Sequence, residues 1–118
     1  MSRVLVVDDD NDTCWLISCF LKDDGYDVDS AHSGRDALRK ISHNRYDLII
    51  LDIRLYKISG LTVLEKVQAI SPSTRTIMIS AYGDKSTRER AGELEVYDFM
   101  EKPVDMTKLM KVAKKALK

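Results

Sequence analysis

The strongest constraint on the fold is a regular alternation between short apolar runs and longer segments with apolar residues at helical spacing. The runs are almost continuously apolar, which is typical of strands that are covered on both faces. Strands that are joined through helices pair in parallel, because only a crossover connection can link them. The sequence therefore predicts a three-layer α/β domain, with helices on both faces of a five-stranded parallel sheet. The predicted strands are residues 4–7, 28–31, 48–51, 76–79 and 97–100.

Several helices carry recognisable start or stop signals. Gly25 is placed to end the first helix in a left-handed conformation, Ser33 opens a capping box for the second, and Asp105 caps the last. The fourth helical segment, within residues 83–95, is highly charged and has a thin apolar face, with a capping box predicted over residues 86–89. The predicted core stripe of the first helix is Thr13, Leu16, Ile17, Phe20 and Leu21, and that of the third is Val63, Leu64, Val67 and Ile70.

Length and composition exclude several classes of protein. With 118 residues, of which 44% are hydrophobic, the chain can bury one core, so one domain over residues 1–118 is expected. Nineteen basic and nineteen acidic residues leave no global field that would hold nucleic acid or an anionic membrane. No signal segment and no apolar run of ~20 residues is found, so we expect a soluble, cytoplasmic protein. Cys14 and Cys19 are expected to be reduced thiols.

Polar residues follow four of the five predicted strands. Asp8 and Asp9 follow the first strand and Asp52 follows the third. Ser80 follows the fourth and Lys102 lies just beyond the fifth. In an open parallel sheet, ligands bind at the carboxyl ends of the strands. The sequence therefore predicts one polar site at that edge.

The chemistry of this set favours a hard cation and a phosphoryl group. Two like charges 4 Å apart cost ~4 kcal/mol at an effective dielectric near 20, so three carboxylates need a proton or a cation between them. Because the donors are all oxygens, Mg²⁺ is expected, with Mn²⁺ as the second choice. Lys102 adds a fixed positive charge, Ser80 can donate one hydrogen bond, and an aspartate such as Asp52 can act as a nucleophile toward phosphorus.

Other interpretations of the charged residues are weaker. Asp8, Asp10 and Asp12 have the spacing of an EF-hand loop, but Thr13 and Cys19 stand where that loop needs Gly and Glu. Asp10 and Asp12 are better explained as charges at a helix N-terminus. The lysines of the last helix are interpreted as a solvated face rather than a nucleic-acid site, and neither histidine is assigned a role; these residues are Lys108, Lys111, Lys115, Lys118, His32 and His43.

On these residues the chain resembles the response-regulator receiver family from end to end. The matching segments are Val6 to Asp10, Leu48 to Asp52, Gly60, Ile79 to Ala81, and Phe99 to Pro103. The resemblance implies a flavodoxin-like (βα)5 fold with strand order 2-1-3-4-5. Residues 81–84 and 97–99 are similar to receivers of the nitrogen-regulator type, which in that group precede an ATPase domain and a DNA-binding domain; the 118 residues hold no such domains.

The resemblance also implies a role for each site residue. Asp52 would be the phosphorylated nucleophile, and Asp8 and Asp9 would bind metal together with the backbone carbonyl of Arg54. Lys102 would contact the phosphoryl group. Ser80 and Phe99 would be the switch pair that changes the surface of the fourth helix, fifth strand and fifth helix. The donor would be a sensor histidine kinase or a phosphotransfer protein, and a second copy of the chain is a candidate partner, in a homodimer that depends on phosphorylation. The chain would be an enzyme only in catalysing its own phosphorylation and dephosphorylation.

The chain departs from the family pattern at three positions. Tyr56 stands where the family usually has Pro, Ser59 replaces a frequent Asp, and Glu95 replaces a common Gly before the fifth strand. None of them belongs to the reactive set. The loss of Pro frees the backbone of the loop that presents the Arg54 carbonyl, so these changes bear on loop geometry.

Two other functions and one docking surface are weighed against this. A Mg²⁺-dependent phosphohydrolase with an aspartate nucleophile would need a motif that residues 8–12 do not complete, and a cap domain for which 118 residues leave no room. A receiver-like module that is never phosphorylated would retain charges at a cost in stability. Trp15 and Cys19 lie off the predicted core stripe and are candidates for kinase docking, or Trp15 packs on the last helix.

Overall fold

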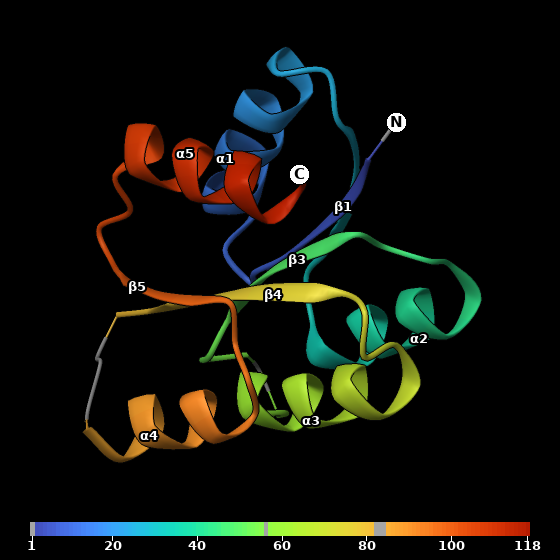
Figure 1. Ribbon diagram of the computed structural model, residues 1–118, viewed down its shortest axis with the longest axis vertical. Helices are drawn as coiled ribbons and strands as arrows, with labels where there is room; N and C mark the ends of the chain where they lie inside the picture. Colours follow the sequence, from blue (N-terminus) through green and yellow to red (C-terminus); the bar gives the residue numbers. More distant parts are fainter. Residues whose placement is uncertain (1, 56, 82–84) are drawn as a thin grey trace.

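A computed structural model describes residues 2–55, 57–81 and 85–118. Within them five strands alternate with five helices, and the strands form one parallel sheet in the order β2-β1-β3-β4-β5. Helices α1 and α5 cover one face of this sheet, while α2, α3 and α4 cover the other (Figure 1). The predicted three-layer α/β fold is confirmed. The elements are β1 (Arg3–Val7), α1 (Asn11–Asp23), β2 (Asp27–Ala31), α2 (Gly34–His43), β3 (Leu48–Asp52), α3 (Gly60–Ile70), β4 (Arg75–Ser80), α4 (Lys85–Glu93), β5 (Asp98–Glu101) and α5 (Met106–Ala116).

The apolar strands supply two cores, one on each face of the sheet. Successive residues of a strand point to opposite faces, so a strand between two helix layers must be apolar at every position. In β3 all five residues are buried; Leu48 and Ile50 join the core under α1 and α5, and Ile49 and Leu51 the core under α2 and α3. In the described part of the chain no helix is both long and apolar enough to cross a membrane.

The core stripe of α1 differs from the predicted one. Cys14, Ile17, Ser18 and Leu21 are buried, whereas Leu16 and Phe20 are 41% and 42% exposed. The predicted stripe followed hydrophobicity and missed a small polar residue that packs well. The hydroxyl of Ser18 donates to the Cys14 carbonyl at 2.7 Å, so it is buried with its hydrogen bond made. The prediction that Trp15 packs on the last helix is also wrong, because Trp15 is 69% exposed.

The helix ends follow most of the sequence signals. Ser33 and Asp105 accept hydrogen bonds from the N–H groups of Asp36 and Lys108, and Gly25 has a φ of +90° after α1. In α3, Val63, Leu64 and Val67 are buried but Ile70 is 53% exposed, because it lies in the last turn.

Helix α4 has the thin apolar face that was predicted, with Ala91 as its buried residue. The predicted capping box is wrong, since α4 already begins at Lys85 and Ser86 lies inside it. Tyr56, which departs from the receiver family, and residues 82–84, which resemble nitrogen-regulator receivers, lie outside the described part of the chain.

Candidate functional site

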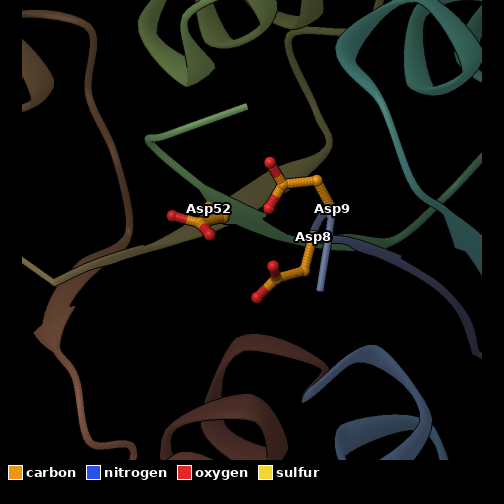
Figure 2. Close-up of side chains that lie close together, drawn as sticks. All are labelled: Asp8, Asp9 and Asp52. Carbon is orange, nitrogen blue, oxygen red and sulfur yellow. The ribbon is translucent and has the colours of Figure 1, made fainter. Parts of the chain in front are cut away.

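Three carboxylates meet at the carboxyl edge of the sheet, as predicted. β1 and β3 are neighbours, with Val7 paired to Leu51, so the residues that follow them emerge side by side. One carboxylate oxygen from each of Asp8, Asp9 and Asp52 lies within 4.8 Å of the others. Figure 2 shows the three side chains projecting beyond the ends of these two strands. Asp8 and Asp52 are buried and Asp9 is exposed, so the cluster opens to solvent on one side.

Gly60 allows the helix after the third strand to begin against the backbone of Asp52. Its N–H donates to the carbonyl of Ile53 at 2.7 Å. A Cβ at Gly60 would lie 2.3 Å from the carbonyl oxygen of Asp52 and 2.7 Å from the Cα of Ile53. Both neighbours are backbone atoms, which cannot give way as the end of a side chain can. The glycine therefore keeps Asp52 in its place at the sheet edge.

Lys102 brings one positive charge to the carboxylates. Its Nζ lies 2.9 Å from Asp52 Oδ2 and 3.3 Å from Asp8 Oδ2, and its N–H donates to the Ser80 carbonyl at 2.8 Å. Burial lowers the pKa of the Lys102 ammonium, but the hydrogen bond and charge of Asp52, followed by those of Asp8, raise it above its ordinary value. Lys102 is therefore a fixed cation at neutral pH.

The carboxylates outnumber this cation. Burial raises the pKa of Asp8 to about 6, and the charge of Asp52 adds to this, although the Asp10 N–H and Lys102 partly offset both effects. The N–H groups of Asp10 and Arg54 donate to Asp8 and Asp52, at 2.9 and 3.1 Å. Asp8 and Asp52 are thus both buried and share the ammonium of Lys102. All the donors are oxygens, so the residues fit a hard divalent cation such as Mg²⁺.

Ser80 and Phe99, the two residues predicted to form a switch pair, share one face of the sheet. Ser80 ends β4 and is 2% exposed, and it lies one residue beyond Ile79, which pairs with Asp52. On the other side of β4, Phe99 pairs with Met78 and Glu101 pairs with Ser80. Side chains two apart in a strand point the same way, so Ser80 and Phe99 both face α4. The structure thus brings the predicted switch pair to adjoining strands.

Asp10 and His32 both contact Asp8 at the border of the cluster. Asp10 caps α1, accepting from the Asp12 N–H and the Thr13 hydroxyl, and the Thr13 hydrogen bond lowers its pKa. The interpretation of Asp10 and Asp12 as charges at a helix N-terminus is confirmed, because Asp10 is the N-cap of α1 and Asp12 lies in its first turn. His32, to which the sequence assigned no role, has its Nδ1 3.4 Å from the Asp8 carbonyl oxygen. Its position directly after β2 could have indicated from the sequence that it lies at the same edge of the sheet as the carboxylates.

A comparison with protein families decides what kind of domain this is. The profile of the response regulator receiver domain matches residues 4–114. The chain belongs to this family. Receiver domains are signalling domains of two-component systems, and their family typically binds Mg²⁺ through acidic residues and is phosphorylated.

Similar proteins include receivers from transcriptional regulators. The chain is 32% identical over 114 residues to the transcriptional regulatory protein ZraR of Escherichia coli K12, covering 97% of the chain and 26% of ZraR. It is 34% identical over 116 residues to the nitrogen assimilation regulatory protein NtrX of Azorhizobium caulinodans, with 97% and 26% covered. The chain thus spans about a quarter of the length of these curated relatives. The predicted resemblance to nitrogen-regulator receivers is confirmed.

Solved receiver structures have the same fold. The CheY-like receiver domain from Methanospirillum hungatei JF-1 superposes with a TM-score of 0.97 at 27% identity, over 99% of this chain and 94% of that one. NtrX from Brucella abortus, solved in complex with ATP, superposes with a TM-score of 0.90 at 34% identity, over 98% of this chain and 27% of that one. The predicted strand order 2-1-3-4-5 is the one observed.

Proposed function

We propose that residues 1–118 form one receiver domain that takes a phosphoryl group onto Asp52 in a Mg²⁺-dependent reaction. The donor is a sensor histidine kinase or a phosphotransfer protein, and the reaction takes place in the cytoplasm. The observation that carries this proposal is the placement of Asp52 among Asp8, Asp9 and Lys102, with Lys102 Nζ 2.9 Å from its carboxylate. A nucleophilic carboxylate beside a metal site and a fixed cation is the arrangement that phosphoryl transfer requires.

The residues divide the chemistry between them. A carboxylate oxygen of Asp52 attacks phosphorus, and the donor leaves on the opposite side. Asp8, Asp9, Asp52 and the Arg54 carbonyl would hold Mg²⁺, which neutralises charge on the phosphoryl oxygens. Lys102 contacts one phosphoryl oxygen and compensates its charge, as its position between Asp8 and Asp52 supports. Ser80 donates a hydrogen bond to another oxygen.

The same site argues against the two other functions. A phosphohydrolase of the kind considered needs a second aspartate as acid and base, and Asp10 already caps α1. A module that is never phosphorylated has no use for Asp8 and Asp52, whose burial at one site is unfavourable. The proposal therefore rests on the reactive set, and the chain acts as an enzyme only on itself.

Phosphorylation by acetyl phosphate with MgCl₂, read by mass spectrometry of the intact chain and its peptides, tests this function. We expect one phosphoryl group on the peptide that contains Asp52, none after Asp52→Asn, and none in a chelator. Asp12→Asn is the matched control, because Asp12 is exposed in the first turn of α1. Catalytic release of phosphate with no label on the chain would indicate the hydrolase. Neither label nor release of phosphate would indicate the module that is never phosphorylated.

Helix α1 is the proposed docking surface for the kinase. Trp15 is 69% exposed, and Cys19 is half-buried on the same side of α1. Trp15 lines a hollow of about 540 Å³ together with Asn11 and His32, among others, and Leu16 lines a separate hollow with Lys102 and Pro103. Trp15→Ala should leave acetyl phosphate labelling unchanged and slow transfer from a kinase. Equal loss of both reactions would contradict docking.

The proposed output is a change in the surface of α4, β5 and α5. A phosphoryl group on Asp52 draws the Ser80 hydroxyl toward it, and the ring of Phe99 then turns inward into the space that opens. The new surface regulates transcription through a homodimer that depends on phosphorylation. Ser80→Ala should still accept phosphate but show a much smaller change in the amide spectra of α4. A full response in this variant would exclude the hydroxyl as the coupling group.

A further inference from the structure

Arg88 of α4 contacts two side chains of β5 at once. Its guanidinium carbon lies 4.8 Å from the centroid of the Phe99 ring, within the range of a cation–π interaction. Its Nη2 lies 3.5 Å from Glu101 Oε1. One side chain thus bridges the helix and the strand of the proposed output surface.

The register of β5 explains how one guanidinium reaches both partners. Phe99 and Glu101 are two residues apart in the strand, so their side chains point to the same face. Their partners across the ladder, Met78 and Ser80, face the same way. Arg88 therefore covers Phe99 on the face of the sheet to which Ser80 also points.

The Phe99 ring is positioned to move. Phe99 is half-buried and lines a hollow of about 340 Å³ together with Arg88, Met100 and Glu101, among others. Among the described residues of α4, Ala91 is the one that is buried. The neighbouring Arg90 pairs with Glu65 of α3 and with Glu93, both at 3.0 Å, and so ties α4 to α3 rather than to β5. The contact with Phe99 and Glu101 therefore belongs to Arg88.

We propose that Arg88 is a latch, which holds the Phe99 ring at the surface of β5 and so restrains the switch before phosphorylation. The inference rests on the proposed function, and it adds the group that sets the resting state. When the ring turns inward, the cation–π contact is lost and Arg88 keeps at most its ion pair with Glu101. Because the side chains of Arg88 and Glu101 are largely exposed, the latch is weak, and its loss should shift the switch equilibrium by about threefold to tenfold.

The test compares Arg88→Met with Arg90→Met, each made in the 118-residue chain. Methionine keeps an unbranched stem and a high helix propensity, so both variants should keep α4. The chain has two phenylalanines, and Phe20 lies on α1, so selective ¹³C labelling of phenylalanine rings gives one signal for Phe99 and one internal reference. Spectra are recorded without phosphate and again with acetyl phosphate and MgCl₂.

Without phosphate, we expect the Phe99 signal of Arg88→Met to lie part of the way toward its position in the phosphorylated wild-type chain. Its labelling by acetyl phosphate should be about threefold to tenfold faster. Arg88→Lys, which keeps the charge but not the planar guanidinium, should fall between this variant and the wild type. Arg90→Met and the Phe20 signal should not change.

An unshifted Phe99 signal in Arg88→Met, or an equal shift in Arg90→Met, would overturn the latch while leaving phosphorylation of Asp52 intact. If the wild-type chain accepts no phosphate, the proposed function fails instead. In that case a Phe99 signal that is the same in Arg88→Met and in the wild type would still overturn the latch.

Discussion

The two edges of the sheet carry polar clusters of opposite character. At the amino edge, Arg3 donates to Asp29 at 3.0 Å and to Asn44 at 3.2 Å, and its guanidinium stacks on the Tyr46 ring at 5.3 Å. The Tyr46 hydroxyl donates to Asp29 at 2.7 Å. Burial, and then the hydrogen bond and charge of Asp29, raise the pKa of Tyr46, so it remains a neutral donor.

At the carboxyl edge the balance is different. The side chains of Asp8 and Asp52 are only 3% and 5% exposed, and both contact the same ammonium of Lys102. Asp29 at the amino edge keeps 33% of its side-chain surface in solvent and has two donors of its own. The charge of Asp29 is thus paired without any addition. At the carboxyl edge, the burial of the Asp8 and Asp52 carboxylates is unfavourable, and a bound cation would offset this cost.

The largest difference should come from a methyl group added at each edge. Gly60→Ala places a Cβ against the backbone of Asp52 and Ile53, so we expect a loss of about 2–4 kcal/mol in the free energy of unfolding and slower phosphorylation. Gly25→Ala at the amino edge meets no atom within 4 Å and should lose only the cost of a positive φ, about 1 kcal/mol. Urea unfolding and acetyl phosphate labelling measure both effects. Normal labelling in Gly60→Ala would contradict the role of that close approach.

Neutralising one carboxylate at each edge should change stability in opposite directions. Asp8→Asn in metal-free buffer at neutral pH should stabilise the chain by about 1–3 kcal/mol, because the charged form of Asp8 is disfavoured by burial. Asp29→Asn should destabilise it by about 1–2 kcal/mol, because Arg3 and Tyr46 lose a charged acceptor. Thermal unfolding in a chelator reads both signs. A change in stability of the same sign in both variants would contradict the proposed difference between the two edges.

The smallest effect concerns Glu95, which lies before β5 at the amino edge. Glu95 has a φ of +59° directly after α4, a conformation that favours glycine. Glu95→Gly should therefore stabilise the chain by about 0.5–1 kcal/mol without changing the labelling of Asp52. Chemical denaturation with parallel labelling checks this. A loss of stability would mean that the Glu95 side chain compensates for its backbone conformation.

The site could be predicted because the position of its residues relative to the strands can be read from the sequence. Asp8, Asp9 and Asp52 each follow an apolar strand, and parallel pairing then requires them to meet. The family pattern also marked Gly60, but its steric reason appeared only with the 2.3 Å approach to the Asp52 carbonyl.

The errors arose where packing outweighs hydrophobicity. In α1 the buried position went to Ser18 and not to Leu16 or Phe20, because a hydroxyl bonded within its own helix can be covered. No residue pattern could have shown Arg88 over Phe99, since eleven positions of the sequence separate them and their contact depends on how α4 lies on β5.

Protonation of Asp8 provides a further test of the metal site at the carboxyl edge. Because the pKa of Asp8 in the metal-free chain is raised to about 6, protons should compete with Mg²⁺ below that pH and leave it free above. The apparent Mg²⁺ affinity should therefore be constant well above pH 6 and fall as the pH is lowered through that value. Calorimetric titration across this range measures it. An affinity that is independent of pH would mean that Asp8 is not a ligand.

The most direct test of the account is a Mg²⁺ titration of the metal-free chain followed by its free energy of unfolding, in the wild type and in Asp8→Asn. We expect Mg²⁺ to stabilise the wild type by an amount that rises with the logarithm of its concentration above the dissociation constant, and to have little effect on Asp8→Asn, which has lost a ligand. Equal stabilisation of both, or of neither, would contradict a metal site built from the carboxylates of the carboxyl edge.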